Sequence, residues 1–155
     1  MQLPPGLRHI LAETKLFTDA KDYVILRLPT TEAAMAAELI ATIEHPFVGM
    51  TRDKDEITLV LPGEIWAEQS PMVEVFEESP DYNLITFDLP LDLGLVGYFA
   101  ILANAVAEAG VSIFPVSSFS RDHIFVPVED FDRAWNALRE LIHACQIEEA
   151  AETGE

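Results

Sequence analysis

Cysteine is almost absent from this chain: Cys145 is the one thiol in 155 residues, so no internal disulfide can form. A chain without disulfides suits a reducing compartment, and we expect a cytoplasmic location. Cys145 falls on an apolar helical pattern near the C-terminus. Its position favours a small core residue over a reactive nucleophile.

Cationic side chains are also scarce. Nine Lys and Arg residues stand against 27 Asp and Glu residues, which gives a formal net charge of −18. A polyanion repels phosphate backbones and anionic lipid headgroups, so we expect neither nucleic acid nor a membrane surface as a partner. The plainest consequence of the excess charge is solubility.

Long apolar runs and catalytic motifs are missing as well. No stretch of 18 apolar residues free of charge exists, and the N-terminus lacks the apolar run of a signal peptide. The four histidines form no H-x-x-x-H pair, and neither phosphate-binding glycine motif nor nucleophile elbow occurs. We therefore expect no metal, no cofactor and no catalytic residues.

What remains alternates between strand and helix patterns in an order that repeats. The first half predicts, in sequence, strand 23–28, helix 32–44, a hairpin of strands 47–51 and 57–61, helical turn 64–69 and strand 72–76. The second half predicts strand 84–89, helix 94–109, strands 111–116 and 123–126, and helix 129–145. Each half therefore follows a ferredoxin-like β-α-β-β-α pattern.

The boundary between the halves is expected at Ser79-Pro80-Asp81. This divides the chain into domains 9–78 and 82–146, followed by a disordered acidic tail, 147–155. The second half lacks a final strand, and an open sheet edge is a pairing hazard. We expect residues 9–17 to form the strand that fills this place. The predicted fold class is α+β, with two interlaced ferredoxin-like domains, antiparallel sheets and helices on one face.

The stretch from Phe87 to Leu138 resembles the second ACT domain of small tandem ACT-domain proteins. These are related to the animal cytosolic arginine sensors and the regulatory domains of aspartate kinases. The matching pieces are Leu91-Asp92, Leu95, Gly97, AEAGVSIF (107–114), Ser117-Ser118-Phe119, Asp122 and Val128-Glu129-Asp130. The first half, in YVILRLP and VGMTRDKDEITLVLP, resembles the family's degenerate first ACT domain. The resemblance implies two ACT folds that bind a small ligand, usually an amino acid, where two such folds meet, without catalysis.

The turn before helix 94–109 is the candidate binding site. A helix N-terminus offers unpaired N–H groups and partial positive charge to a carboxylate. Gly94 and Gly97 allow backbone to approach a ligand, and Asp92 can accept an ammonium group. Strand 111–116 can supply main-chain donors and acceptors. The ligand-binding residues implied by the resemblance are Asp92, Gly94, Leu95, Val96, Gly97, Ser112, Ile113 and Asp122.

Structural readings compete with this assignment. Asp92 can serve as an ordinary N-cap, and the two glycines can serve a tight turn and close packing alone. Arg121, where the family tends to have a small polar residue, either favours an acidic ligand or pairs with a surface carboxylate. Phe119 and His123 replace family tyrosines, so the ligand of the relatives is not transferred to this chain.

Pro115 interrupts a strand that lies at the sheet edge in this fold. Because proline donates no hydrogen bond, we expect it to limit continuous sheet formation between two second domains.

The sequence therefore favours a cytoplasmic sensor or regulatory protein that binds an amino acid and forms a homodimer. The alternative is an interaction domain whose ancestral pocket has closed. An open cavity beside Gly94, Gly97 and Ser112 would favour the sensor, and side chains filling that space would favour the alternative. A small enzyme would require a cleft with converging polar groups, which the sequence does not indicate.

Overall fold

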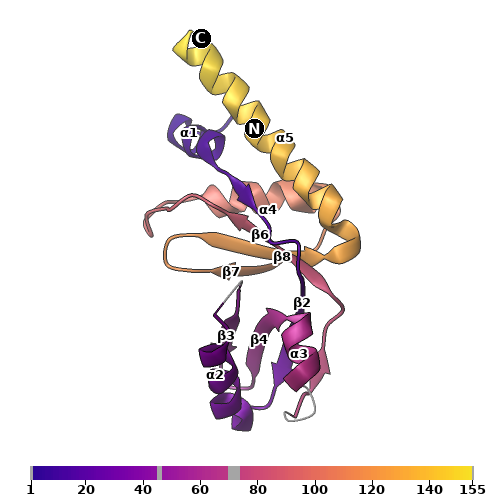
Figure 1. Ribbon diagram of the computed structural model, residues 1–155. Helices are drawn as coiled ribbons and strands as arrows, with labels where there is room; N and C mark the ends of the chain where they lie inside the picture. Colours follow the sequence, from indigo (N-terminus) through magenta and orange to yellow (C-terminus); the bar gives the residue numbers. More distant parts are fainter. Residues whose placement is uncertain (1, 45–46, 70–73, 155) are drawn as a thin grey trace. The chain divides into compact units, whose positions relative to one another are not determined.

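The computed structural model describes residues 2–44, 47–69 and 74–154 as helices and antiparallel strands (Figure 1). The chain divides into two compact units. One unit is Asp19–Leu84, and the other combines Met1–Thr18 with Ile85–Glu155. The N-terminal segment thus belongs to the same unit as the second half of the chain.

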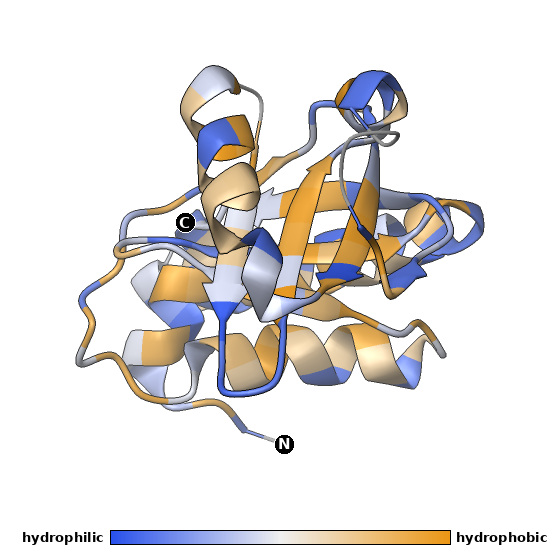
Figure 2. Ribbon diagram, turned by 90° about the horizontal axis from the view of Figure 1, so that it is seen from below, coloured by the Kyte–Doolittle hydropathy of each residue, from blue (hydrophilic) through white to orange (hydrophobic). Residues whose placement is uncertain are grey.

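The unit Asp19–Leu84 follows the predicted β-α-β-β-α order. Its elements are β2 (Asp22–Leu28), a 3-10 turn (Thr30–Glu32), α2 (Ala33–Thr42), β3 (Gly49–Arg52), β4 (Ile57–Pro62), α3 (Gly63–Gln69) and β5 (Glu77–Glu78). Strand β4 pairs antiparallel with both β2 and β3. Alternate residues of β2 and β4 join Ala36 and Leu39 of α2 and Trp66 of α3 in one core, as the period of two in a strand requires. Figure 2 shows the strands of the unit Asp19–Leu84 coloured mostly as hydrophobic, consistent with the burial of β2 and β4 in the core of that unit.

Two predictions in this unit need correction. The predicted strand 72–76 begins at residues outside the described ranges, and its described part, 74–76, is not strand. The Phe76 N–H donates to the Arg27 carbonyl of β2 at 2.8 Å, and the strand β5 follows, where Glu78 lies opposite Leu26. Helix α2 ends at Thr42 rather than 44, because the Thr42 hydroxyl donates to the Leu39 carbonyl and Ile43 is extended. Pro46, the expected end of that helix, lies outside the described residues.

The described residues of the other unit form three α-helices and four strands. Its elements are α1 (Pro5–Glu13), β1 (Leu16–Phe17), β6 (Tyr82–Phe87, from Ile85 onward), α4 (Tyr98–Glu108), β7 (Phe114–Ser117), β8 (Asp122–Pro127), a 3-10 turn (Val128–Asp130) and α5 (Phe131–Thr153). Strand β8 lies between β6 and β7, and β1 pairs with β6. Helices α1, α4 and α5 lie on the same side of these strands (Figure 1). Pro115 lies on β7, the edge strand.

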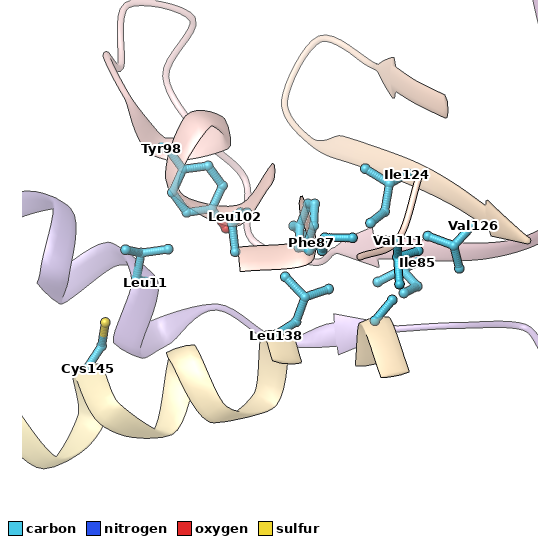
Figure 3. Packing of buried hydrophobic residues seen from close by; sticks show 12 residues of the cluster. Leu11, Ile85, Phe87, Tyr98, Leu102, Val111, Ile124, Val126, Leu138 and Cys145 are labelled. Atoms are coloured by element: carbon cyan, nitrogen blue, oxygen red, sulfur yellow. The ribbon is translucent and has the colours of Figure 1, made fainter. Parts of the chain in front are cut away.

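The core of this unit lies between the helices and the strands (Figure 3). Leu11, Phe87, Leu102 and Leu138 come from α1, β6, α4 and α5, and each is fully buried. Each such side chain contributes roughly 1.5–3 kcal/mol on burial. Cys145 is buried in the same cluster, so its prediction as a core residue is confirmed.

The predicted strand 9–17 is wrong for most of its length. Residues Pro5–Glu13 form helix α1, with proline in the first turn, where its missing N–H is tolerated. Only Leu16 and Phe17 form a strand, and they pair antiparallel with Phe87 and Thr86 of β6. The strand that completes the second half therefore comes from the N-terminal segment, but it is only two residues long.

The predicted disordered tail, 147–155, is also wrong. Helix α5 continues to Thr153 and ends at Gly154, which has a left-handed φ of 76°. Arg8 of α1 is buried, and it forms ion pairs with Glu148, Glu149 and Glu152. This counter-charge offsets part of the repulsion within the acidic run and holds the end of α5 beside α1.

The helix predicted at 94–109 is observed as α4, which begins four residues later than predicted and ends one residue earlier. Gly97 precedes the helix with a φ of +89°, outside the right-handed helical region, and α4 therefore starts at Tyr98. Gly110, with a φ of +78°, follows the helix as expected. The predicted strand 111–116 starts at Phe114, because the Val111 N–H still donates to the Val106 carbonyl at the helix end.

Candidate ligand-binding site

Two loops of the larger unit enclose a cavity beside the first turn of α4. One loop, residues 91–97, follows β6, and the other, residues 118–121, joins β7 to β8. The cavity measures about 340 Å³, at the lower end of the range of roughly 300–1,000 Å³ typical of small-molecule pockets. Its lining residues are Leu91, Asp92, Leu93, Leu95, Gly97, Tyr98, Phe99, Ala100, Ser117, Ser118, Phe119, Ser120, Arg121 and Asp122.

Main-chain hydrogen bonds fix these loops. The Leu91 N–H donates to the Ser120 carbonyl at 2.7 Å and joins one loop to the other. Within the loops, the Leu95 N–H donates to the Asp92 carbonyl at 3.1 Å and the Ser118 N–H to the Arg121 carbonyl at 2.9 Å. The cavity is therefore bounded by two defined turns.

The first turn of α4 presents free main-chain donors to this cavity. No side chain caps the helix, and its first main-chain bond runs from the Ile101 N–H to the Gly97 carbonyl. Among the residues that the structure describes, the N–H groups of Tyr98, Phe99 and Ala100 have no acceptor. All three residues line the cavity. Free N–H groups and the positive end of a helix dipole suit a carboxylate.

Charged side chains of both signs border the same space. The Asp92 side chain is exposed, and within the described ranges it forms no hydrogen bond or ion pair. Asp122 accepts a hydrogen bond from the Ser117 hydroxyl at 2.7 Å. Arg121 donates from Nε to a carboxylate oxygen of Asp88 at 2.9 Å. Of the two alternatives for Arg121, the structure therefore shows the pairing with a surface carboxylate.

Buried polar groups connect the cavity to the core. The Tyr98 hydroxyl lies 2.7 Å from Thr14 Oγ1, and burial raises the pKa of Tyr98 to about 12. His123 Nδ1 lies 2.8 Å from Thr86 Oγ1 and His123 Nε2 lies 3.2 Å from Ser118 Oγ. Burial is the main cause that lowers the pKa of His123, so its ring is neutral at pH 7.

The structure brings together half of the residues implied by the resemblance. Asp92, Leu95, Gly97 and Asp122 line the cavity. Gly94 and Val96 belong to the same turn but do not line it, and the Val96 side chain is 82% exposed.

Ser112 and Ile113 lie outside the cavity. They follow the C-terminal end of α4, and eleven helical residues span about 16 Å. Strand β7 runs back along α4. Its last residue, Ser117, therefore lies near the helix N-terminus, and the residues that precede β7 do not. The main-chain groups expected from strand 111–116 are therefore at the wrong end of α4.

Sequence reasoning missed Tyr98 and Ser118, as well as Ser117 at the end of β7. The signal was available in the polar run at 117–118, since a strand antiparallel to the preceding helix ends beside that helix's first turn.

The structural readings of the turn are only partly supported. Asp92 does not cap α4, because Gly97 occupies the N-cap position. A Cβ added at Gly94 would meet nothing within 4 Å, so close packing does not explain that glycine. Gly97 differs, because its positive φ disfavours any residue with a Cβ. The cavity is open beside Gly97 and is not filled by neighbouring side chains.

The rest of the described chain offers other cavities but no metal cluster. A groove of about 730 Å³ lies along α5, and one of about 530 Å³ lies beside α3 in the unit Asp19–Leu84. Both are larger than the cavity at α4, but neither adjoins the N-terminus of a helix of eight or more residues. Within the described ranges, no group of three His, Cys, Asp or Glu residues can hold a metal ion, and no helix could cross a bilayer.

Comparison with known proteins identifies the fold class and one domain. Residues 77–140 match the family model of the ACT domain. A Vibrio cholerae protein, described as of unknown function and a possible transport protein, is 28% identical with a TM-score of 0.68, over 88% of this chain and 95% of that one. An Agobacterium tumefaciens protein is 25% identical with a TM-score of 0.65, over 83% of this chain and 89% of that one. No curated protein matches.

The regulatory subunit of aspartate kinase from Thermus flavus shares the fold. Its TM-score is 0.58 at 17% identity, over 81% of this chain and 95% of that one. The predicted resemblance to ACT-domain proteins is therefore confirmed, as is the α+β fold class with ferredoxin-like halves. An ACT domain in residues 77–140 supports a regulatory, ligand-binding role for that part of the chain.

Proposed function

We propose that this chain is a regulatory protein without catalytic activity of its own and that it binds a free amino acid at the N-terminus of α4. The observation that carries the proposal is the open cavity beside the three unpaired N–H groups of Tyr98, Phe99 and Ala100. The ACT-domain match over residues 77–140 supports the same assignment.

A zwitterion fits the arrangement of charge. Its carboxylate accepts hydrogen bonds from the first turn of α4, where the helix dipole is positive. Its ammonium group faces Asp92, whose side chain has no other partner in the described part of the chain, and Asp122. Arg121 is already paired with Asp88. The residues that line the cavity therefore include no free cation that could select an amino acid with an acidic side chain.

We propose that the protein works as a cytoplasmic homodimer whose ligand stabilises one arrangement of its domains, which a partner protein then recognises. The single thiol supports a reducing compartment. The acidic composition supports a protein without nucleic acid or membrane partners.

Thermal denaturation of the full chain with each of the twenty amino acids tests this proposal. An amino acid present at 100 times its dissociation constant should stabilise the protein by about 2.7 kcal/mol. The Asp92→Asn variant should lose most of that shift, because it removes the negative charge that pairs with the ammonium group. Asp132→Asn, an exposed carboxylate in the first turn of α5, serves as the matched control and should retain it. No shift with any amino acid at millimolar concentration would contradict the proposal.

A second candidate function is an assembly domain without a small ligand. Three large apolar residues lie on the two loops around the cavity. The exposed fractions are 68% for Leu93, 82% for Val96 and 78% for Phe119. Apolar side chains this exposed on two loops around one cavity favour contact with another protein. If the protein associates through these loops and no amino acid shifts its stability, the assembly function is preferred.

A further inference from the structure

A groove of about 730 Å³ lies between the segment that joins α1 to β1 and one face of α5. Lys15 and Leu16 line it from that segment, and Trp135, Arg139, Glu140 and His143 line it from α5. It shares no lining residue with the cavity at α4. The groove is therefore separate from the proposed amino-acid site.

The groove collects cations that have no partner. Six of the nine Lys and Arg side chains form ion pairs: Arg8, Lys21, Arg27, Lys54, Arg121 and Arg133. Within the described residues, Lys15, Arg52 and Arg139 form none. Two of these three therefore line one groove, together with His143 and against a single carboxylate, Glu140. In a chain of net charge −18, this concentration of unpaired positive charge is unusual.

An aromatic surface lies beside these cations. The Trp135 ring stacks on Phe131, with centroids 5.5 Å apart and planes 26° from parallel, which fixes its orientation. Trp135 is half-buried, and Leu16 and Ile142 add apolar surface to the groove. A fixed indole ring with apolar neighbours favours a flat, apolar group in contact with it.

The parts of the groove are already in register. Trp135, Arg139 and His143 are four residues apart on α5, so their side chains lie on one face of the helix. The Gln146 amide donates to the Ala12 carbonyl at 3.1 Å and holds α5 against the N-terminal segment. A ligand would therefore meet a formed site.

We infer that this groove is a second ligand site, specific for a small organic anion with a flat apolar body, such as an aromatic carboxylate or a ring-bearing phosphate. The Arg139 guanidinium suits a bidentate contact with the anionic group, and the Lys15 ammonium adds a second charge. The ring of the ligand contacts Trp135. A free amino acid fits poorly here, because its ammonium group would face the two cations.

A titration monitored by nuclear magnetic resonance tests the inference on the full chain. The probe is 2-naphthoate, and the matched probe is 2-naphthylmethylammonium, which carries the same ring and the opposite charge. We expect 2-naphthoate to shift the Trp135 indole N–H and the amides of residues 14–16 saturably, and to bind about tenfold more tightly than the cation. Increasing salt should weaken the binding.

Variants locate the charge that is responsible. The double variant Lys15→Gln/Arg139→Gln should bind 2-naphthoate at least about tenfold more weakly. Arg133→Gln, which removes a cation on the same helix outside the groove, should bind normally. The inference is overturned if both probes bind equally, if the double variant binds like the native chain, or if the shifts map to residues 91–100 instead.

Discussion

Arg8 shows how one residue decides the state of a distant segment. Its side chain is buried, and its ion pairs reach Glu148, Glu149 and Glu152, about 140 positions away in the sequence. The hydrogen bond from Arg8 is the largest cause that lowers the pKa of Glu149. Without that cation, the acidic run would repel itself, as the sequence alone suggests.

Replacing Arg8 by methionine tests this interpretation. The change keeps apolar bulk and removes the charge, so the three glutamates lose their shared partner. We expect the amides of residues 148–153 to lose most of their protection in hydrogen exchange, while those of residues 134–145 keep theirs. Arg133→Met, whose ion pair with Asp130 is local and exposed, is the control. Full protection of residues 148–153 in the Arg8→Met variant would contradict the role given to this arginine.

His123 gives the stability a defined dependence on pH. Because burial lowers its pKa in the folded state, its contribution is present above the ordinary value of 6.5 and is lost as the pH falls through the lower folded value. We expect the free energy of unfolding to decrease as the pH falls from about 6.5 to the lower folded pKa of His123, and this contribution to level off below it. His143→Gln, an exposed histidine, should retain this dependence.

The His123→Phe variant should remove that dependence and lower stability at pH 7. Phenylalanine leaves the Thr86 hydroxyl without its partner on His123, at a cost of about 1–3 kcal/mol. Chemical denaturation at several pH values measures both effects. A variant as stable as the native chain at pH 7, with the same dependence on pH, would contradict this account.

At the scale of elements, the start of α4 is set by a single glycine. Gly97 has a φ of +89°, and a Cβ there would also come within 3.4 Å of Leu7. Gly97→Ala should therefore destabilise the protein by about 1–2 kcal/mol. Gly94→Ala is the matched control three residues away, because a Cβ there meets nothing within 4 Å. Equal unfolding free energies for the two variants would contradict the assigned start of the helix.

Local patterns predicted the central elements and failed where distant contacts decide the structure. Strands β2 and β4 carry dense β-branched and apolar runs, so their positions could be predicted within a residue or two. Helix α1 was missed because Pro4-Pro5-Gly6 resembles a loose lead-in, although proline is favoured in a first helical turn. The end of α5 depends on Arg8, and no local pattern reveals that pairing.

The candidate site was predicted mainly on one side, with Asp122 as the single predicted residue on the facing side that lines the cavity. Asp92, Leu95 and Gly97 could be predicted because the turn precedes the helix directly in the sequence. Ser117 and Ser118, on the facing side, were not predicted. Their place beside the cavity depends on the direction in which β7 returns along α4 and on the residue at which that strand begins. Ser112 and Ile113 were implied by the family resemblance, and the predicted strand 111–116 begins three residues before the observed β7.

At the scale of the whole molecule, the chain has two compact units, one of which includes both of its ends. The larger unit holds the cavity at α4 and the groove along α5, which differ in charge. The first offers free N–H groups beside two aspartates, which suits a zwitterion, and the second offers unpaired cations beside an indole ring. The two proposed sites therefore suit ligands of different charge.

The central claim is that the unpaired N–H groups of Tyr98, Phe99 and Ala100 bind the carboxylate of a free amino acid. The most direct measurement is a titration of the isotope-labelled full chain with each of the twenty amino acids, followed through these three amide resonances. We predict that at least one amino acid shifts all three saturably, and that Asp92→Asn weakens the effect. If none of the twenty shifts them, or if the shifts occur only outside residues 91–100 and 117–122, the account is contradicted.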